Sequence, residues 1–160
     1  MASKHHKIIP KLLNDLIKDY PCLKKVRCLK LNDPNSKKVI EYMPDYIIKR
    51  DISSHSYYFV IFEIIDRQPD VKTIADICRI IAKPEIKKAI FISCSKKKKE
   101  ETDRLISVIV GNYKDRFNKR NNKEILDISS REINAKDNEE TISNLIYEEL
   151  KIFLPKVPKT

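Results

Sequence analysis

Two acidic residues, Asp45 and Glu63, stand inside apolar stretches and are the strongest candidates for chemistry. Asp45 belongs to the run MPDYII at 43–48, and Glu63 to the run YFVIFEII at 58–65. A carboxylate inside an apolar strand is unfavourable unless another group compensates its charge. Two carboxylates on neighbouring strands can share a divalent cation. The pair therefore predicts either a metal site or two separately satisfied acids, Asp45 by hydrogen bonds near a turn and Glu63 by a salt bridge to Lys72 or Arg79.

Hydrophobic spacing predicts the elements that would position these acids. The predicted strands cover residues 26–31, 38–50, 57–65, 88–94 and 124–129. Helices are predicted over residues 8–17, after 70, over 100–117 and after 137. The second of these helices is expected to pack an apolar face formed by Val71, Ile74, Ile77, Cys78 and Ile81. The order α-β-β-β-α-β-α-β-α predicts one α/β domain over residues 1–160, with a mixed sheet of about five strands and helices on both faces.

This order, with Pro44-Asp45 on the second strand and Glu63 on the third, resembles the PD-(D/E)XK nuclease superfamily. The resemblance implies a restriction-endonuclease-like fold, Mg²⁺ or Mn²⁺ held by Asp45 and Glu63, and hydrolysis of DNA phosphodiesters. The lysine that completes the motif would stand at position 65, where this chain has Ile65. Side chains alternate along a strand, so residue 65 should face the same side as Glu63. In some branches of the family the lysine lies on the following helix, which makes Lys72 the candidate catalytic residue.

Other acidic residues are candidates for additional metal ligands. Members of the family often take one from the first helix, where Asp15 and Asp19 are available. Glu41 shares the side of its strand with Asp45, because the two are an even number of residues apart. The many relatives that act as dimers make a homodimer a further expectation.

The chain is strongly basic, with a net charge of +10. Such an excess favours a polyanionic partner, with nucleic acid, and DNA in particular, first and an acidic membrane surface second. The alternative is a lysine-rich composition without functional meaning. The run at 96–99, formed by Lys96, Lys97, Lys98 and Lys99, is predicted to lie in the turn before a helix and to contact DNA phosphates, together with Lys49. A solvated loop is the alternative for that run.

Composition also excludes several functions. The single glycine leaves neither a dinucleotide-binding turn nor a phosphate-binding P-loop possible. The four cysteines form no C-x-x-C pair, which disfavours structural zinc, while a Cys–His nucleophilic pair stays open. No apolar run approaches the ~20 residues of a membrane span, so no membrane partner is expected. The first residues lack a secretory apolar segment, which favours a cytoplasmic location.

Three functions follow from these features. The preferred one is a metal-dependent DNA nuclease with Asp45, Glu63 and Lys72 as catalytic residues. The second is a catalytically inactive relative that acts as a DNA-binding or assembly module, which Ile65 favours. The third is a protein-interaction domain that binds no nucleic acid.

Overall fold

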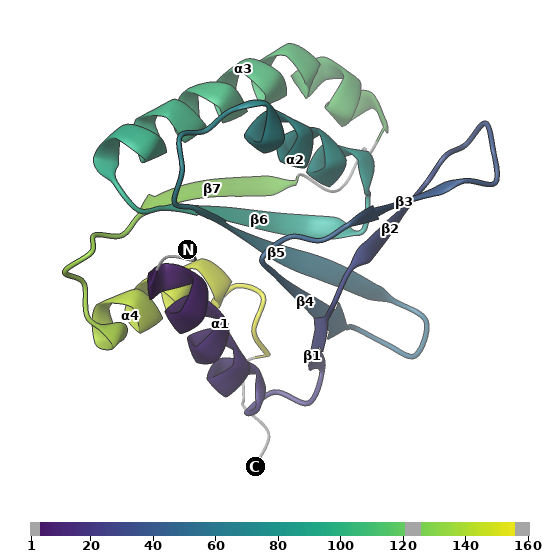
Figure 1. The fold of residues 1–160 in the computed structure, drawn as a ribbon. Coiled ribbons are helices and arrows are strands. Elements are labelled where there is room, and N and C mark those ends of the chain that lie inside the picture. The colour runs from purple at the N-terminus through teal and green to yellow at the C-terminus, as the bar shows by residue number, and fades with distance from the viewer. Residues whose placement is uncertain (1–3, 121–125, 156–160) are drawn as a thin grey trace.

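The computed structural model describes residues 4–120 and 126–155, and within them the side chains of 4–112 and 126–155 (Figure 1). In this part of the chain the helices are α1 (Lys4–Ile17), α2 (Val71–Ala82), α3 (Lys96–Arg120) and α4 (Glu139–Leu150). The strands are β1 (Leu23–Val26), β2 (Leu29–Asn32), β3 (Val39–Tyr42), β4 (Tyr46–Asp51), β5 (Tyr57–Ile65), β6 (Ile86–Ser93) and β7 (Asp127–Glu132).

Five of the strands form a mixed sheet in the order β1-β4-β5-β6-β7. The first three pair antiparallel, whereas β5, β6 and β7 pair parallel. The parallel strands are joined by α2 and α3, because a parallel connection must cross from one end of the sheet to the other. Strands β2 and β3 form a separate hairpin that projects from the body of the molecule (Figure 1). The predicted α/β class with a mixed sheet is confirmed.

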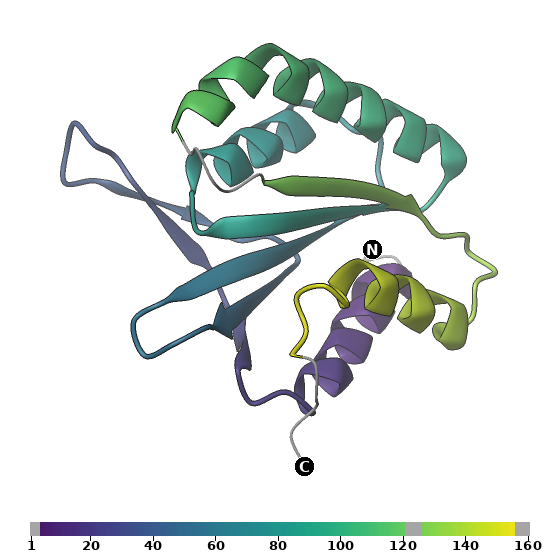
Figure 2. The same ribbon diagram turned by 180° about the vertical axis from the view of Figure 1, so that it is seen from behind.

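Two helical layers cover the sheet, with α1 and α4 on one face and α2 and α3 on the other (Figures 1 and 2). An apolar core lies on each face of the sheet, and strand β5 contributes to both. Val60, Phe62 and Ile64 pack toward α1 and α4. Phe59 and Ile61 pack toward α2 and α3. The continuous apolar sequence of β5 thus reflects burial on both faces.

Two predicted strands are each divided in the structure. The predicted strand 26–31 separates into β1 and β2, and the predicted strand 38–50 into β3 and β4. Pro44 lies at the second break and has no N–H for a strand ladder. The break between β1 and β2 lies opposite the break at Pro44, because β1 pairs with β4 while β2 pairs with β3. The last predicted strand, 124–129, is observed as β7 from Asp127, and Glu124 lies outside the described residues.

A buried ion-pair cluster fixes α4 against the sheet. Lys88 of β6 is 5% exposed and its ammonium donates to Ser129 Oγ at 2.7 Å and pairs with Glu149 Oε2 at 3.0 Å. Arg131 also pairs with Glu149, at 3.1 Å. Burial opposes ionisation of Glu149, but hydrogen bonds from Lys88, Ser129 and Arg131 outweigh it and lower the pKa of the carboxyl.

Replacing Lys88 with methionine is therefore expected to destabilise the fold by about 3 kcal/mol at pH 7, because it leaves a buried carboxylate with fewer partners. The loss should shrink as pH falls through the lowered pKa of Glu149, since protonation removes the uncompensated charge. Urea denaturation at pH 7 and pH 4 measures both values. An equal loss at the two pH values would contradict this role of Glu149.

Candidate functional site

The strands that carry Asp45 and Glu63 hold the two carboxylates next to each other. Asp45 immediately precedes β4, at the end of the strand where Tyr46 pairs with Phe62 of β5. The Asp45 backbone N–H donates to Glu63 Oε1 at 2.9 Å, and the Ile64 N–H donates to Asp45 Oδ2 at 2.7 Å. Each carboxylate thus accepts a hydrogen bond from the other strand's backbone, which fixes both side chains at one corner of the sheet.

Glu63 is a buried acid, with only 3% of its surface exposed. The Tyr42 hydroxyl donates to its Oε2 at 3.4 Å. Burial raises the pKa of Glu63 to about 9, and the hydrogen bond with Asp76 and the charges of Asp76 and Asp45 act in the same direction. Without a cation, Glu63 is therefore mainly protonated at neutral pH.

Asp76 of α2 is the third acid of the cluster, and sequence reasoning missed it. It is 4% exposed, and it pairs with Lys72 at 3.2 Å and with Arg79 at 3.1 Å. The salt bridge considered for Glu63 is thus made by Asp76, which in turn contacts Glu63. Asp76 is the only acidic residue of α2, and this is the sequence feature that could have drawn attention to it.

The predicted apolar face of α2 is wrong in part. Its buried residues are Thr73, Asp76, Ile77 and Ile80. Val71 is 78% exposed and Ile74 38% exposed. The helix carries two competing apolar stripes, and the one that includes Asp76 faces the sheet, where Asp76 contacts Glu63.

Lys72 lies beside this cluster, as expected for a lysine carried by the helix. Its ammonium reaches Asp76 Oδ2 at 3.2 Å, while 79% of its side chain remains exposed. Partial burial lowers the pKa of Lys72, but the charges of Glu63, Asp76 and Asp45 outweigh this effect and raise it. Lys72 is therefore a cation within electrostatic reach of all three acids.

Ile65 occupies the same side of β5 as Glu63, as the alternation of the strand predicts. It packs against the apolar cluster shared by the sheet, α2 and α3. Position 65 is therefore filled by a partly buried apolar residue, and the structure places Lys72 near the acids.

The first helix contributes a histidine to the site instead of an acid. His6 Nε2 lies 3.5 Å from Asp45 Oδ1, and His6 Nδ1 lies 3.2 Å from Asp66 Oδ2. Asp15 pairs with Lys18 on the exposed side of α1, and Asp19 is exposed beyond its end. Two adjacent histidines at the start of a helix gave no signal of this contact.

Glu41 lies outside the site. It is exposed on β3, opposite Lys30 of β2. Its strand belongs to the hairpin, so the break at Pro44 removes it from the face that carries Asp45.

The carboxylates fit a magnesium or manganese ion by chemistry and by number. Among the described residues no group of three or more His, Cys, Asp or Glu side chains is arranged to hold a metal. Mg²⁺, however, keeps several waters and needs only one or two protein carboxylates. Asp45 and Glu63 each have one oxygen engaged by a backbone N–H, while the second oxygen of Glu63 accepts from the Tyr42 hydroxyl and that of Asp45 lies near His6. A buried acid that resists ionisation is also a group whose charge a cation would stabilise.

The four predicted DNA-binding lysines lie in the first turn of α3, and not in the turn before it. Ser95 precedes the helix and its Oγ accepts the N–H of Lys98 at 3.2 Å, which starts the helix earlier than apolar spacing indicated. The Lys98 ammonium donates to the Asp66 carbonyl at 2.8 Å. This contact places the run at the end of β5 near the acids, with Lys96 and Lys97 exposed.

Lys49 lies toward the opposite end of β4. Its ammonium is 3.6 Å from Asp51 and 4.5 Å from the centre of the Tyr57 ring. A contact between Lys49 and DNA stays a prediction, and it would involve another part of the surface than the lysines of α3.

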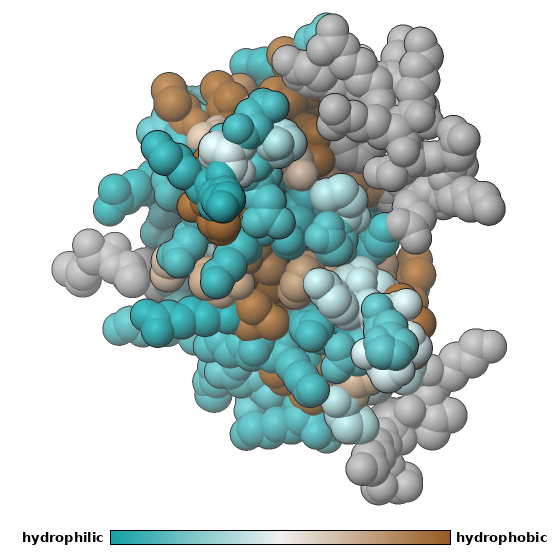
Figure 3. Space-filling model, turned by 90° about the vertical axis from the view of Figure 1, so that its right-hand side faces the viewer, coloured by the Kyte–Doolittle hydropathy of each residue, from teal (hydrophilic) through white to brown (hydrophobic). Residues whose placement is uncertain are grey.

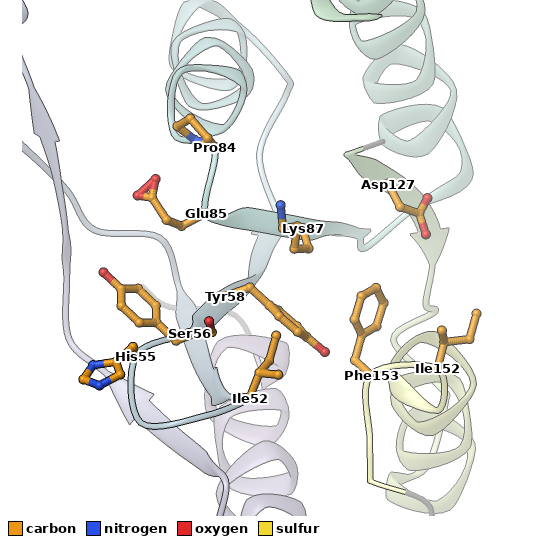
Figure 4. Close-up of a pocket in the computed structure, with 11 residues that line it drawn as sticks. Ile52, His55, Ser56, Tyr58, Pro84, Glu85, Lys87, Asp127, Ile152 and Phe153 are labelled. Atoms are coloured by element: carbon orange, nitrogen blue, oxygen red, sulfur yellow. The ribbon is translucent and has the colours of Figure 1, made fainter. Parts of the chain in front are cut away.

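An open hollow of about 890 Å³ lies at that opposite end of the sheet (Figure 4). Tyr57, Tyr58 and Phe153 contribute its rings, and His55 and Lys87 lie at its edge. The Tyr58 ring packs edge-on against Phe153 at 5.8 Å. The hollow is remote from Glu63, which lies toward the other end of β5, so the acids do not line it.

Comparisons with protein-family models, with curated proteins and with solved structures found no match to this chain. Among the described residues, no helix has both the length and the apolar character needed to cross a membrane.

Proposed function

We propose that this protein is a divalent-metal-dependent DNA nuclease resembling the PD-(D/E)XK type. One observation carries the proposal: the buried Glu63 lies against Asp45 and Asp76, with the Lys72 ammonium beside them. Buried acids placed together are unfavourable on their own, and clusters with strongly shifted pKa values are typical of functional sites. A cation would offset that cost.

Asp45 and Glu63 would hold the Mg²⁺ or Mn²⁺ ion, which when bound supplies a positive charge to the scissile phosphate. Asp76 contacts Glu63 and keeps Lys72 and Arg79 at the site. Lys72, largely exposed and charged, would orient the attacking water or stabilise the negative charge of the phosphate. His6 would keep Asp45 in place through its contact at 3.5 Å.

DNA would approach over the basic first turn of α3, which lies beside the acids. The face toward which hairpin β2–β3 projects, mostly hydrophilic in Figure 3, lies on the other side of the molecule from this turn (Figures 1 and 3). The approach is therefore proposed from the four lysines of the turn and from the net charge of +10.

The double change Lys96→Gln and Lys97→Gln is expected to weaken DNA binding and to lower the slope of log affinity against log salt by about 2, because each lysine accounts for one released counterion. Fluorescence anisotropy at several salt concentrations measures this slope. The matched control is Lys11→Gln with Lys18→Gln, two exposed lysines, one in α1 and one just after its end. Equal slopes in the two double variants would exclude a phosphate contact by this turn.

A second candidate function is a catalytically silent DNA-binding module. Ile65 supports it, because this partly buried apolar residue stands where the motif lysine is expected. In this case the ion pair between Lys72 and Asp76 would be a structural contact within α2.

Cleavage of labelled single-stranded, duplex and branched DNA with Mn²⁺ tests the proposal. Metal-dependent cutting by the wild type that is lost in Asp45→Asn and kept in Asp33→Asn, a change at a partly exposed residue after β2, would support the nuclease. Salt-sensitive binding without cutting would favour the silent module. Neither cutting nor binding would favour the protein-interaction domain.

A further inference from the structure

Cys94 and His5 form a contact that the proposed nuclease does not use. Cys94 follows β6, and His5 lies in the first turn of α1, 89 residues away in the chain. The His5 Nδ1 atom lies 3.2 Å from the Cys94 Sγ atom. This distance is short for a hydrogen bond that involves sulfur, so the thiol and the imidazole interact directly.

His5 is a buried histidine, only 4% exposed. Burial lowers its pKa, and the backbone of Asn134 partly opposes this effect. In the tautomer that carries its proton on Nε2, the neutral ring accepts a hydrogen bond from the Cys94 thiol at Nδ1. The Nε2 atom has no hydrogen-bond partner among the described residues, and the ring is oriented by Cys94 and by the backbone of Asn134.

The surroundings of this pair are mainly basic. The positive charges of Lys4 and His6 in α1 lower the pKa of His5, whereas the negative charge of Asp137, before α4, raises it. Cys94 also lies two residues before α3 begins at Lys96, and a helix N-terminus stabilises a thiolate. Cys94 itself is partly exposed.

We infer that Cys94 and His5 form a thiol–imidazole pair that makes Cys94 a modification site for hydroperoxides and other soft electrophiles. The other cysteines serve as internal references. Cys78 is exposed, and Cys22 and Cys28 are partly exposed. Exposure alone would make Cys78 the most reactive thiol, whereas the pair assigns that property to Cys94.

The reaction with a hydroperoxide balances without a further reactant. Nδ1 of His5 takes the proton of the Cys94 thiol, and the thiolate sulfur attacks the nearer peroxide oxygen. The S–O bond forms while the O–O bond breaks, and the leaving hydroxide or alkoxide takes the proton from the imidazolium. The products are a cysteine sulfenic acid and water or an alcohol, so sulfur is oxidised and the peroxide is reduced.

The test measures alkylation of each cysteine in the folded wild-type protein by iodoacetamide, with peptide mass spectrometry, from pH 5.5 to 9. At pH 6 the rate at Cys94 is expected to exceed that at Cys78 by about tenfold, because a thiol pKa lowered by one unit raises the thiolate fraction tenfold. Dimedone labelling after hydrogen peroxide should mark the same residue. A faster rate at Cys78, with Cys94 following the pH profile of an ordinary thiol, would overturn the inference.

Variants separate the imidazole from the local environment. His5→Gln should remove the advantage of Cys94, whereas His55→Gln, a change at an exposed turn, should keep it. If His5→Gln does not fold, the alkylation rates of Cys94 and Cys78 in the wild-type protein decide whether the inference holds. Unchanged reactivity of Cys94 in a folded His5→Gln protein would contradict the role of His5.

Discussion

Replacing Glu63 with glutamine is expected to lower Mn²⁺-dependent DNA cleavage by about a thousandfold, which corresponds to a loss of about 4 kcal/mol of transition-state stabilisation by the ion. Glutamine has nearly the same shape and keeps an oxygen for the Asp45 N–H, but it cannot carry the negative charge of a ligand. Initial rates of cleavage at fixed DNA and Mn²⁺ concentrations measure the change.

The same substitution should stabilise the metal-free protein. The pKa of Glu63 is about 9 in the folded protein and 4.5 in its ordinary state, so folding favours the protonated acid. The contribution of Glu63 to stability is therefore fully present below pH 4.5 and is lost as pH rises toward 9. Glutamine avoids this loss, and its advantage should be near zero at pH 4.5 and about 2 to 3 kcal/mol at pH 7.

Denaturation in the presence of EDTA at pH 4.5, 7 and 9 tests the sign of the stability difference between Glu63→Gln and the wild type, and the pH range over which it grows. Glu139→Gln, at an exposed glutamate of α4, is the control and should show little effect at any pH. Higher stability of Glu63→Gln together with unchanged Mn²⁺ affinity and cleavage would show that Glu63 is a buried acid without a role in metal binding.

Replacing Lys72 with methionine is expected to lower cleavage by about a hundredfold while leaving Mn²⁺ affinity within a few-fold of the wild type, because a lysine acts in the reaction as a proton donor, acceptor or fixed charge. Methionine keeps much of the length and apolar character of the lysine stem. Cleavage rates and Mn²⁺ titration on the same samples separate catalysis from metal binding. Lys18→Met, at an exposed lysine just after α1, is the matched control.

A rescue experiment tests whether position 65 is equivalent to position 72. Ile65 and Glu63 face the same side of β5, so a lysine at 65 would point toward the acids. Ile65→Lys in the Lys72→Met background is expected to restore part of the lost cleavage. An unaffected rate in Lys72→Met would exclude the helix lysine from the reaction.

The strand-borne half of the site could be predicted from the sequence. A charged residue in an apolar, β-branched run is conspicuous, and the period of a strand fixes which residues share its face. These rules identified Asp45, Glu63 and the orientation of residue 65. They also gave the mixed sheet, since a meander followed by alternating helices and strands allows few arrangements.

The helix-borne half could not be predicted in the same way. Asp76 joins the cluster because α2 is rotated so that Thr73, Asp76, Ile77 and Ile80 face the sheet. The sequence of α2 contains a second apolar stripe with Val71 and Ile74, so periodicity alone does not fix this rotation. His6 and His5 reach their partners through packing between layers, and no local pattern records those contacts.

Titration of the metal-free protein with Mn²⁺ by calorimetry tests the central claim that Asp45 and Glu63 form one cation site. The wild type is expected to bind one ion per chain, and Asp45→Asn and Glu63→Gln should each weaken binding by at least tenfold, since each removes one of two charged ligands. Binding of equal strength in the wild type and both variants, or no binding in the wild type in the presence of DNA, would contradict a metal centre at these acids.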